Sequence, residues 1–85
     1  MIQEVGKVIE VFIPKEYKNG QLLDVMDRTQ IGFKVKTNSQ TYEIVQKQNE
    51  INATIMKNDL VIITKQTISN KDFIEIDLYE GDKDV

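Results

Sequence analysis

The sequence contains no histidine and no cysteine among its 85 residues. Without histidine, the chain cannot build a Ser-His-Asp or Cys-His nucleophilic arrangement, and it lacks the usual general base near neutral pH. Without cysteine, it can form neither a disulfide nor a thiolate zinc site. A chain without cysteine suits a reducing compartment, so we expect a cytoplasmic location.

Glycine is scarce and scattered. The four glycines lie at positions 6, 20, 32 and 81. No GxxxxGK[ST] or GxGxxG loop is therefore present to hold a nucleotide phosphate. Acidic pairs such as Asp24 with Asp27 are ordinary surface features, and the C-terminal acidic residues lack the spacing of an EF-hand loop. We expect no catalytic residue, no metal site and no cofactor.

Long apolar runs are absent as well. No run approaches the roughly 18 residues that a membrane-spanning helix needs. The N-terminal stretch 1–14 carries Glu4, Lys7 and Glu10 within its apolar pattern, unlike the uninterrupted apolar segment of a signal peptide. We therefore expect no insertion of this chain into a membrane.

The net charge of −3 is unevenly distributed. Residues 72–85 hold six acidic residues against Lys83, which gives −5, whereas residues 1–71 hold ten basic and eight acidic residues, which gives +2. An evenly acidic protein would repel a nucleic-acid backbone, but this mildly basic body leaves nucleic acid open as a partner. We expect one domain over residues 1–79 and a flexible acidic tail over 80–85.

Runs rich in β-branched residues, separated by turn residues at intervals near ten, predict an all-β domain. The runs cover residues 5–14, 21–27, 31–37, 40–46, 59–66 and 72–79. We expect a small single-domain barrel of five or six mostly antiparallel strands, either OB-like or SH3-like. A short helical turn or an extended crossover is expected near residues 49–57, with Asn49 as a helix cap.

The first run has apolar residues on both faces. Val5, Ile9, Val11 and Ile13 alternate on one face, and Val8 and Phe12 lie on the other. This pattern is typical of a strand that is wrapped in a barrel or bent between two sheets. Gly6 is suited to a bulge or bend, and Pro14 marks an edge or strand end because it donates no hydrogen bond.

Asn19-Gly20 is the strongest hairpin signal, because a type I′ turn needs positive φ at both central positions. This turn would place Tyr17 opposite Leu22 and Ile13 opposite Met26, so that residues 21–27 form a strand. The four-residue spacing of Leu22 and Met26 also fits a single helical turn. We favour the strand.

Asn38-Ser39 predicts a second tight turn. The resulting register pairs Val35 with Tyr42, Phe33 with Ile44, Ile31 with Gln46 and Lys34 with Glu43. The two aromatic residues then lie on the core face, whereas Lys34 and Lys36 point to solvent. A base-stacking platform needs aromatic and basic residues exposed together, so we interpret this hairpin as barrel wall.

A third turn is predicted at Ser69-Asn70, which would pair Ile63 with Ile76 and Val61 with Leu78. Ile74, Ile76 and Leu78 alternate with polar or aromatic residues in the last run. We expect these three side chains to face the core and the acidic face of the same strand to face water.

The order of the runs resembles the OB-fold, a five-stranded Greek-key barrel with a helix or loop between its third and fourth strands. Gly6-Lys7-Val8, which opens a long first strand, and MKNDLVIIT at 56–64, where a turn enters a buried strand, carry this resemblance. The soluble barrel domain of NfeD-type proteins is similar in size and in its ending. The OB-fold resemblance implies binding of single-stranded nucleic acid as one possible function.

Several lysines on different strands could gather on one face of the barrel beside an exposed aromatic residue. The candidate partner surface consists of Lys7, Tyr17, Lys34, Lys36, Lys47, Lys65 and Phe73. Scattered outward lysines are also ordinary charge decoration, and a nucleic-acid domain is usually more basic than this body. We therefore expect a non-enzymatic module that binds another protein or a second copy of itself, with single-stranded nucleic acid as the alternative.

Overall fold

The computed structural model describes residues 1–79, and the tail expected at 80–85 lies outside the described residues. Its elements are β1 (Ile2–Phe12), β2 (Tyr17–Lys18), β3 (Gln21–Leu22), η1 (Val25–Asp27), β4 (Gln30–Lys36), β5 (Thr41–Lys47), η2 (Asn52–Thr54), β6 (Leu60–Ile68) and β7 (Lys71–Leu78). The two η elements are single 3₁₀ turns, so the prediction of a small all-β fold is confirmed. Within residues 1–79, no helix is long and apolar enough to cross a membrane.

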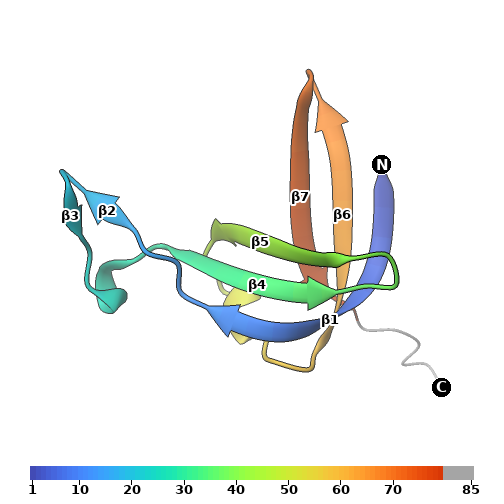
Figure 1. Ribbon diagram of the computed structural model, residues 1–85, viewed down its shortest axis with the longest axis horizontal. Helices are drawn as coiled ribbons and strands as arrows, with labels where there is room; N and C mark the ends of the chain where they lie inside the picture. Colours follow the sequence, from blue (N-terminus) through green and yellow to red (C-terminus); the bar gives the residue numbers. More distant parts are fainter. Residues whose placement is uncertain (80–85) are drawn as a thin grey trace.

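Five strands form one antiparallel sheet in the order β5-β4-β1-β6-β7. Although β5 and β6 follow one another in the chain, they lie on opposite sides of β1 in the sheet. Figure 1 shows β1 bending between two layers, with β4 and β5 in one layer and β6 and β7 in the other. The end strands β5 and β7 contact each other, so the sheet curls toward a partly closed barrel.

Turn chemistry sets the registers of the three hairpins as predicted. Val35 pairs with Tyr42 in β4–β5, and Ile63 pairs with Ile76 in β6–β7. Positive φ angles occur at Asn19, Gly20, Ser69 and Asn70, which are the central residues of the β2–β3 and β6–β7 turns. These are the conformations that primed two-residue turns require.

The core lies between the two layers. Its fully buried side chains include Phe33, Val8 and Val35 from the β1–β4 ladder and Val61 and Ile63 from β6. Burial of Phe33, Ile44 and Tyr42 confirms that the aromatic residues of the β4–β5 hairpin point inward. The last strand contributes less than predicted, because only Ile76 is buried, while Ile74 is 41% exposed and Leu78 is similarly open.

The predicted grouping of the β1 side chains is wrong, because Val8 and Phe12 lie on opposite faces of the strand. A register shift between Val8 and Glu10 makes a bulge at Ile9, so the alternation is interrupted inside the strand. Val5, Ile9 and Val11 are all partly exposed, and Val8 is the apolar residue that β1 buries. The bulge is not at Gly6, which instead lies close to β4, where a Cβ would be 2.6 Å from Val35 Cγ1.

Residues 21–27 are not one strand. Strand β3 ends at Leu22, and the 3₁₀ turn η1 covers Val25–Asp27, so the expected pairing of Ile13 with Met26 does not form. Tyr17 does pair with Leu22, as predicted. Figure 1 shows this small β2–β3 hairpin standing apart from the main sheet.

The crossover from β5 to β6 follows the prediction of a short helical turn. The N-cap of η2 is Ile51 and not Asn49 as predicted; Asn49 lies two residues earlier, and its Oδ1 accepts hydrogen bonds from the backbone N–H groups of Ile51 and Asn52 at 2.9 and 2.8 Å. Asn52 is buried and donates through Nδ2 to the Lys47 carbonyl at 2.9 Å. Ile55 completes the crossover by entering the core.

Candidate functional site

Four of the seven predicted partner-surface residues lie on one outer face, formed by β1, β4 and β5. The register arranges the outward side chains in four rows: Lys7–Lys36–Thr41, Glu10–Lys34–Glu43, Phe12–Gly32–Val45 and Gln30–Lys47. Lys34 is neutralised in the middle of this face, because its Nζ lies 3.4 Å from Glu10 Oε1 and Glu43 is its partner on β5. The lysines therefore do not form a continuous basic stripe.

Lys7 and Lys36 are direct partners across the β1–β4 ladder. Like charges in this arrangement repel each other and destabilise a sheet. Within residues 1–79, neither lysine belongs to either of the two salt bridges, which join Lys34 to Glu10 and Lys65 to Glu4. Lys47, opposite Gln30 on the same face, is likewise outside both salt bridges, but Lys7 and Lys36 are the two such lysines that face each other across a ladder.

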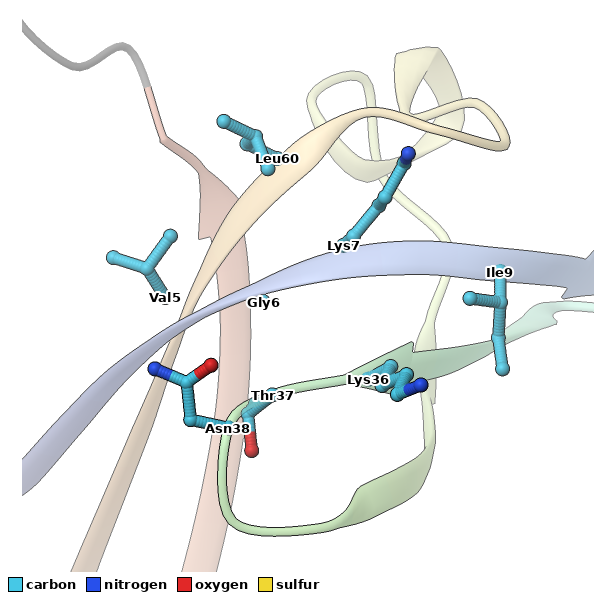
Figure 2. Close-up of a pocket in the computed structure, with 8 residues that line it drawn as sticks. All are labelled: Val5, Gly6, Lys7, Ile9, Lys36, Thr37, Asn38 and Leu60. Carbon is cyan, nitrogen blue, oxygen red and sulfur yellow. The ribbon is translucent and has the colours of Figure 1, made fainter.

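A shallow pocket of about 270 Å³ opens beside the lysine pair. We call it the Lys7–Lys36 pocket; its lining residues are Val5, Gly6, Lys7, Ile9, Lys36, Thr37, Asn38 and Leu60. Figure 2 shows the Lys7 and Lys36 side chains extending in different directions from neighbouring strands. The partly exposed side chains of Val5, Ile9 and Leu60 give the pocket an apolar floor.

Lys65 belongs to an internal polar network and not to the outer face. Its Nζ donates to Tyr42 Oη at 2.8 Å and lies 3.6 Å from Glu4 Oε2. Tyr42 in turn donates to Glu4, and Ser39 Oγ donates to Glu4 Oε1 at 2.7 Å. The Lys65 ammonium also lies 5.1 Å from the centroid of the Tyr42 ring.

These contacts shift the pKa values of two groups. Hydrogen bonds from the Tyr42 and Ser39 hydroxyls lower the pKa of the Glu4 carboxyl below its ordinary 4.5. The hydrogen bond to Tyr42, assisted by the charge of Glu4, raises the pKa of the Lys65 ammonium above its ordinary 10.5. Both groups are therefore held in their charged forms near neutral pH, which makes Lys65 a structural cation and a poor proton donor or nucleophile.

The remaining candidates lie in separate places. Tyr17 is 62% exposed in the β2–β3 hairpin, which forms a separate two-stranded sheet. Phe73 is 43% exposed on β7. Lys47 and Phe73 both line a groove of about 400 Å³ between the end of β5 and the middle of β7. We call this the β7 groove; it is lined by Gln46, Lys47, Asn49, Phe73, Ile74, Glu75, Ile76 and Asp77.

The β7 groove runs beside an open sheet edge. Tyr79 N–H donates to the Leu60 carbonyl at 3.0 Å, which fixes the hydrogen-bond alternation of the β6–β7 ladder. Phe73, Glu75 and Asp77 therefore bond to β6, whereas the N–H and C=O groups of Asp72 and Ile74 point to the other side. No strand pairs with that side of β7 within residues 1–79.

Phe12 is the surface residue that sequence reasoning missed. It pairs with Gly32, and a Cβ on Gly32 would lie only 2.3 Å from Phe12 Cζ, so the ring rests directly on the strand. A glycine inside a strand is a known sign of such close approach, and Gly32 was the signal available in the sequence. The ring lies over Gly32 on the outer face, in the row that continues to Val45 on β5.

Within residues 1–79, no three acidic side chains converge on a point where they could hold a metal ion. The chemistry that these surfaces offer is recognition by charge, apolar contact and backbone hydrogen bonding. No family model matches the chain, and the searches of curated proteins and of solved structures likewise give no match, so the resemblance to NfeD-type barrels gains no support from relatives.

Proposed function

We propose that this chain is a non-enzymatic cytoplasmic module that binds another protein by accepting one of its strands along the open edge of β7. The observation that carries the proposal is the row of backbone groups at Asp72 and Ile74, which the sheet leaves without a strand partner within residues 1–79. Addition of a peptide strand to such an edge is a recurring mode of recognition, in which backbone hydrogen bonds supply affinity.

Side chains along this edge define the partner strand. On the inner side, the partly exposed Ile74 offers apolar contact. On the outer side, Glu75 and Asp77 present carboxylates into the β7 groove. A partner strand that alternates apolar and basic residues satisfies both sides, since successive side chains of a strand point to opposite faces.

The same charges oppose self-association. A second copy of β7 would bring its own Glu75 and Asp77 against those of the first, and acidic side chains on an edge are a common protection against edge-to-edge pairing. The edge is therefore selective for a different, basic chain.

Amide hydrogen exchange tests the proposal at the level of single residues. The probe is the capped peptide Lys-Val-Lys-Val-Lys-Val. We expect its binding to slow exchange at Asp72 and Ile74, while the Phe73 and Glu75 amides, already bonded to β6, keep their rates.

One variant distinguishes the contribution of the Ile74 backbone N–H to peptide affinity from that of the Ile74 side chain. Ile74→Pro removes an N–H that the β6–β7 ladder does not use, so the fold tolerates it while the incoming strand loses a donor. Ile74→Ala is the control, because it shortens the side chain and keeps the N–H. Full peptide affinity in Ile74→Pro, equal to that of Ile74→Ala, would exclude strand addition.

A second candidate function is binding of single-stranded nucleic acid. Five long strands with a 3₁₀ turn between the third and fourth agree with an OB-like arrangement, whose faces bind oligonucleotides in many proteins. Phe12 on the lysine-bearing outer face supplies the specific observation, because base–aromatic stacking is the basis of such binding.

Fluorescence anisotropy with a labelled ten-nucleotide oligothymidylate tests this candidate. Binding at low salt that weakens steeply as salt rises, and that is lost in Phe12→Leu, would favour nucleic acid over strand addition. Phe12→Leu is chosen because it keeps an apolar cover over Gly32 while removing the aromatic face. We expect no binding.

A further inference from the structure

We propose that the Lys7–Lys36 pocket is a second binding site, which takes a carboxylate side chain flanked by apolar residues on an extended peptide of another protein. This site lies on the outer face at the bend of β1, and it does not depend on strand addition at β7. Three features of the pocket define its occupant: the paired lysines, the apolar floor and the limited volume.

The two lysines make the pocket positively charged, which favours an anionic ligand. Lys7 and Lys36 face each other across the ladder, and within residues 1–79 neither has a carboxylate partner. The free protein therefore carries a like-charge repulsion that one bound carboxylate relieves at both ammonium groups. Figure 2 shows the two side chains directed apart, and a carboxylate between them would draw both inward.

The apolar floor of the pocket favours apolar residues next to the bound carboxylate in the peptide. Leu60 lies directly opposite Lys7 on β6, and Val5 lies on the same outer face two residues before Lys7. Both side chains are close to half exposed, so the free protein keeps apolar surface in water next to the cations. Apolar residues on either side of the bound carboxylate cover this surface.

The volume and the number of cations favour a short peptide segment over other classes of ligand. At about 270 Å³, the pocket falls below the roughly 300–1,000 Å³ of sites that enclose small molecules. Two cations with no aromatic residue in the lining are a poor match for a polyanion that needs a track of phosphate contacts and stacking surfaces. A short peptide segment fits both limits.

The direct test uses the full chain labelled with ¹⁵N and the capped peptide Ser-Leu-Glu-Leu-Ser. We expect saturable shifts at the amides of Lys7, Lys36 and Leu60, with no change at Asp72 and Ile74. The matched peptide Ser-Leu-Gln-Leu-Ser should bind about tenfold more weakly, because it loses the charge-assisted contacts. Equal affinity for both peptides would overturn the proposal.

Charge reversal at one lysine distinguishes an effect on peptide affinity from an effect on protein stability. Lys36→Glu replaces the repulsive pair with an attractive one opposite Lys7, so we expect a higher melting temperature together with loss of peptide binding. The double variant Lys18→Gln/Lys71→Gln removes two exposed lysines elsewhere and should keep full affinity. Unchanged binding in Lys36→Glu, or an equal loss in the Lys18/Lys71 variant, would refute the site.

Two competing ligands complete the test. Octanoate offers a carboxylate with an apolar chain, and a ten-nucleotide oligothymidylate offers a polyanion. Failure of both to displace the peptide at matched concentration supports peptide recognition. Displacement by octanoate would reassign the pocket to fatty carboxylates, and displacement by the oligonucleotide would reassign it to nucleic acid; either result overturns the proposal.

Discussion

Phe12 covers Gly32 so closely that a Cβ on the glycine would lie 2.3 Å from Phe12 Cζ and 2.4 Å from Cε2. The ring takes the space that a side chain at position 32 would fill, and it packs on the outer face of the sheet instead of in the core. The two residues therefore depend on each other, although they come from different strands.

This dependence predicts strong coupling between the two positions. Gly32→Ala should destabilise the protein by about 1–3 kcal/mol, because the ring must shift away from the strand. In a Phe12→Ala background, Gly32→Ala should reduce the free energy of unfolding by much less. Urea unfolding of wild type, the two single variants and the double variant measures this difference. Additive effects would show that the ring moves freely.

The network around Glu4 predicts a specific dependence on acid. The folded-state pKa of Glu4 lies below its unfolded value of 4.5, so its contribution to stability is complete above pH 4.5 and is lost as pH falls through the folded pKa. Wild type should therefore be more stable than Glu4→Gln at pH 7, and the gap should narrow below pH 4.5. Melting temperatures measured from pH 7 to pH 3 give this gap.

Tyr42→Phe provides the companion variant, since it removes the hydroxyl that contributes most to the shift. The loss of stability with acid should then be smaller than in wild type and should be complete at a higher pH, because the folded-state pKa of Glu4 lies closer to 4.5. If wild type and Glu4→Gln lose stability in parallel from pH 7 to pH 3, the charged form of Glu4 does not stabilise the folded protein.

Phe33 tests the core. Its side chain is fully buried, and Phe33→Ala should cost about 3–5 kcal/mol. A domain of this size has a total stability of only about 4–13 kcal/mol, so this loss is a large share of the total and the variant should melt far below wild type. Circular dichroism melting measures this, and a transition close to that of wild type would mean that Phe33 is not a core residue.

Asn52 tests the crossover. Its buried amide accepts from the Asn49 N–H at 2.8 Å and donates to the Lys47 carbonyl at 2.9 Å. Asn52→Leu leaves both backbone groups without this partner and should cost about 1–3 kcal/mol. Thr54→Ala, which removes an exposed hydroxyl bonded to the Ile51 carbonyl, is the matched control and should change stability by less than about 0.5 kcal/mol in urea unfolding.

Local sequence patterns were sufficient to predict much of the fold. Asn19-Gly20, Asn38-Ser39 and Ser69-Asn70 each fixed a hairpin, because turn chemistry and two-residue alternation act over a few residues. The same alternation could not reveal the bulge at Ile9, since apolar residues occupy both faces of that run. Ile74 looks like a core residue by pattern, yet it is partly exposed on an edge strand with no further strand beside it within residues 1–79.

The candidate sites depended on information that local patterns do not hold. Lys7 and Lys36 become neighbours only because β1 pairs with β4, and the open edge of β7 exists only because β1 stands in the middle of the sheet. Lys65 looked like another outward lysine, but its place opposite Ile2 and Ile74 puts it on the inner side with Tyr42. Strand order, which the turns do not determine, decided each case.

The central position of β1 also sets the order in which the structure can be completed. The β4–β5 and β6–β7 hairpins close over short stretches of chain, whereas the β1–β6 ladder joins Ile2 to Lys65 and must close a loop across most of the domain. Such long-range closure is entropically costly and slow. During synthesis, the C-terminal half of β1 can pair with β4, whereas residues 2–6 must wait for β6 to leave the ribosome, and until then Ile2 and Val5 are exposed to chaperones and to other nascent chains.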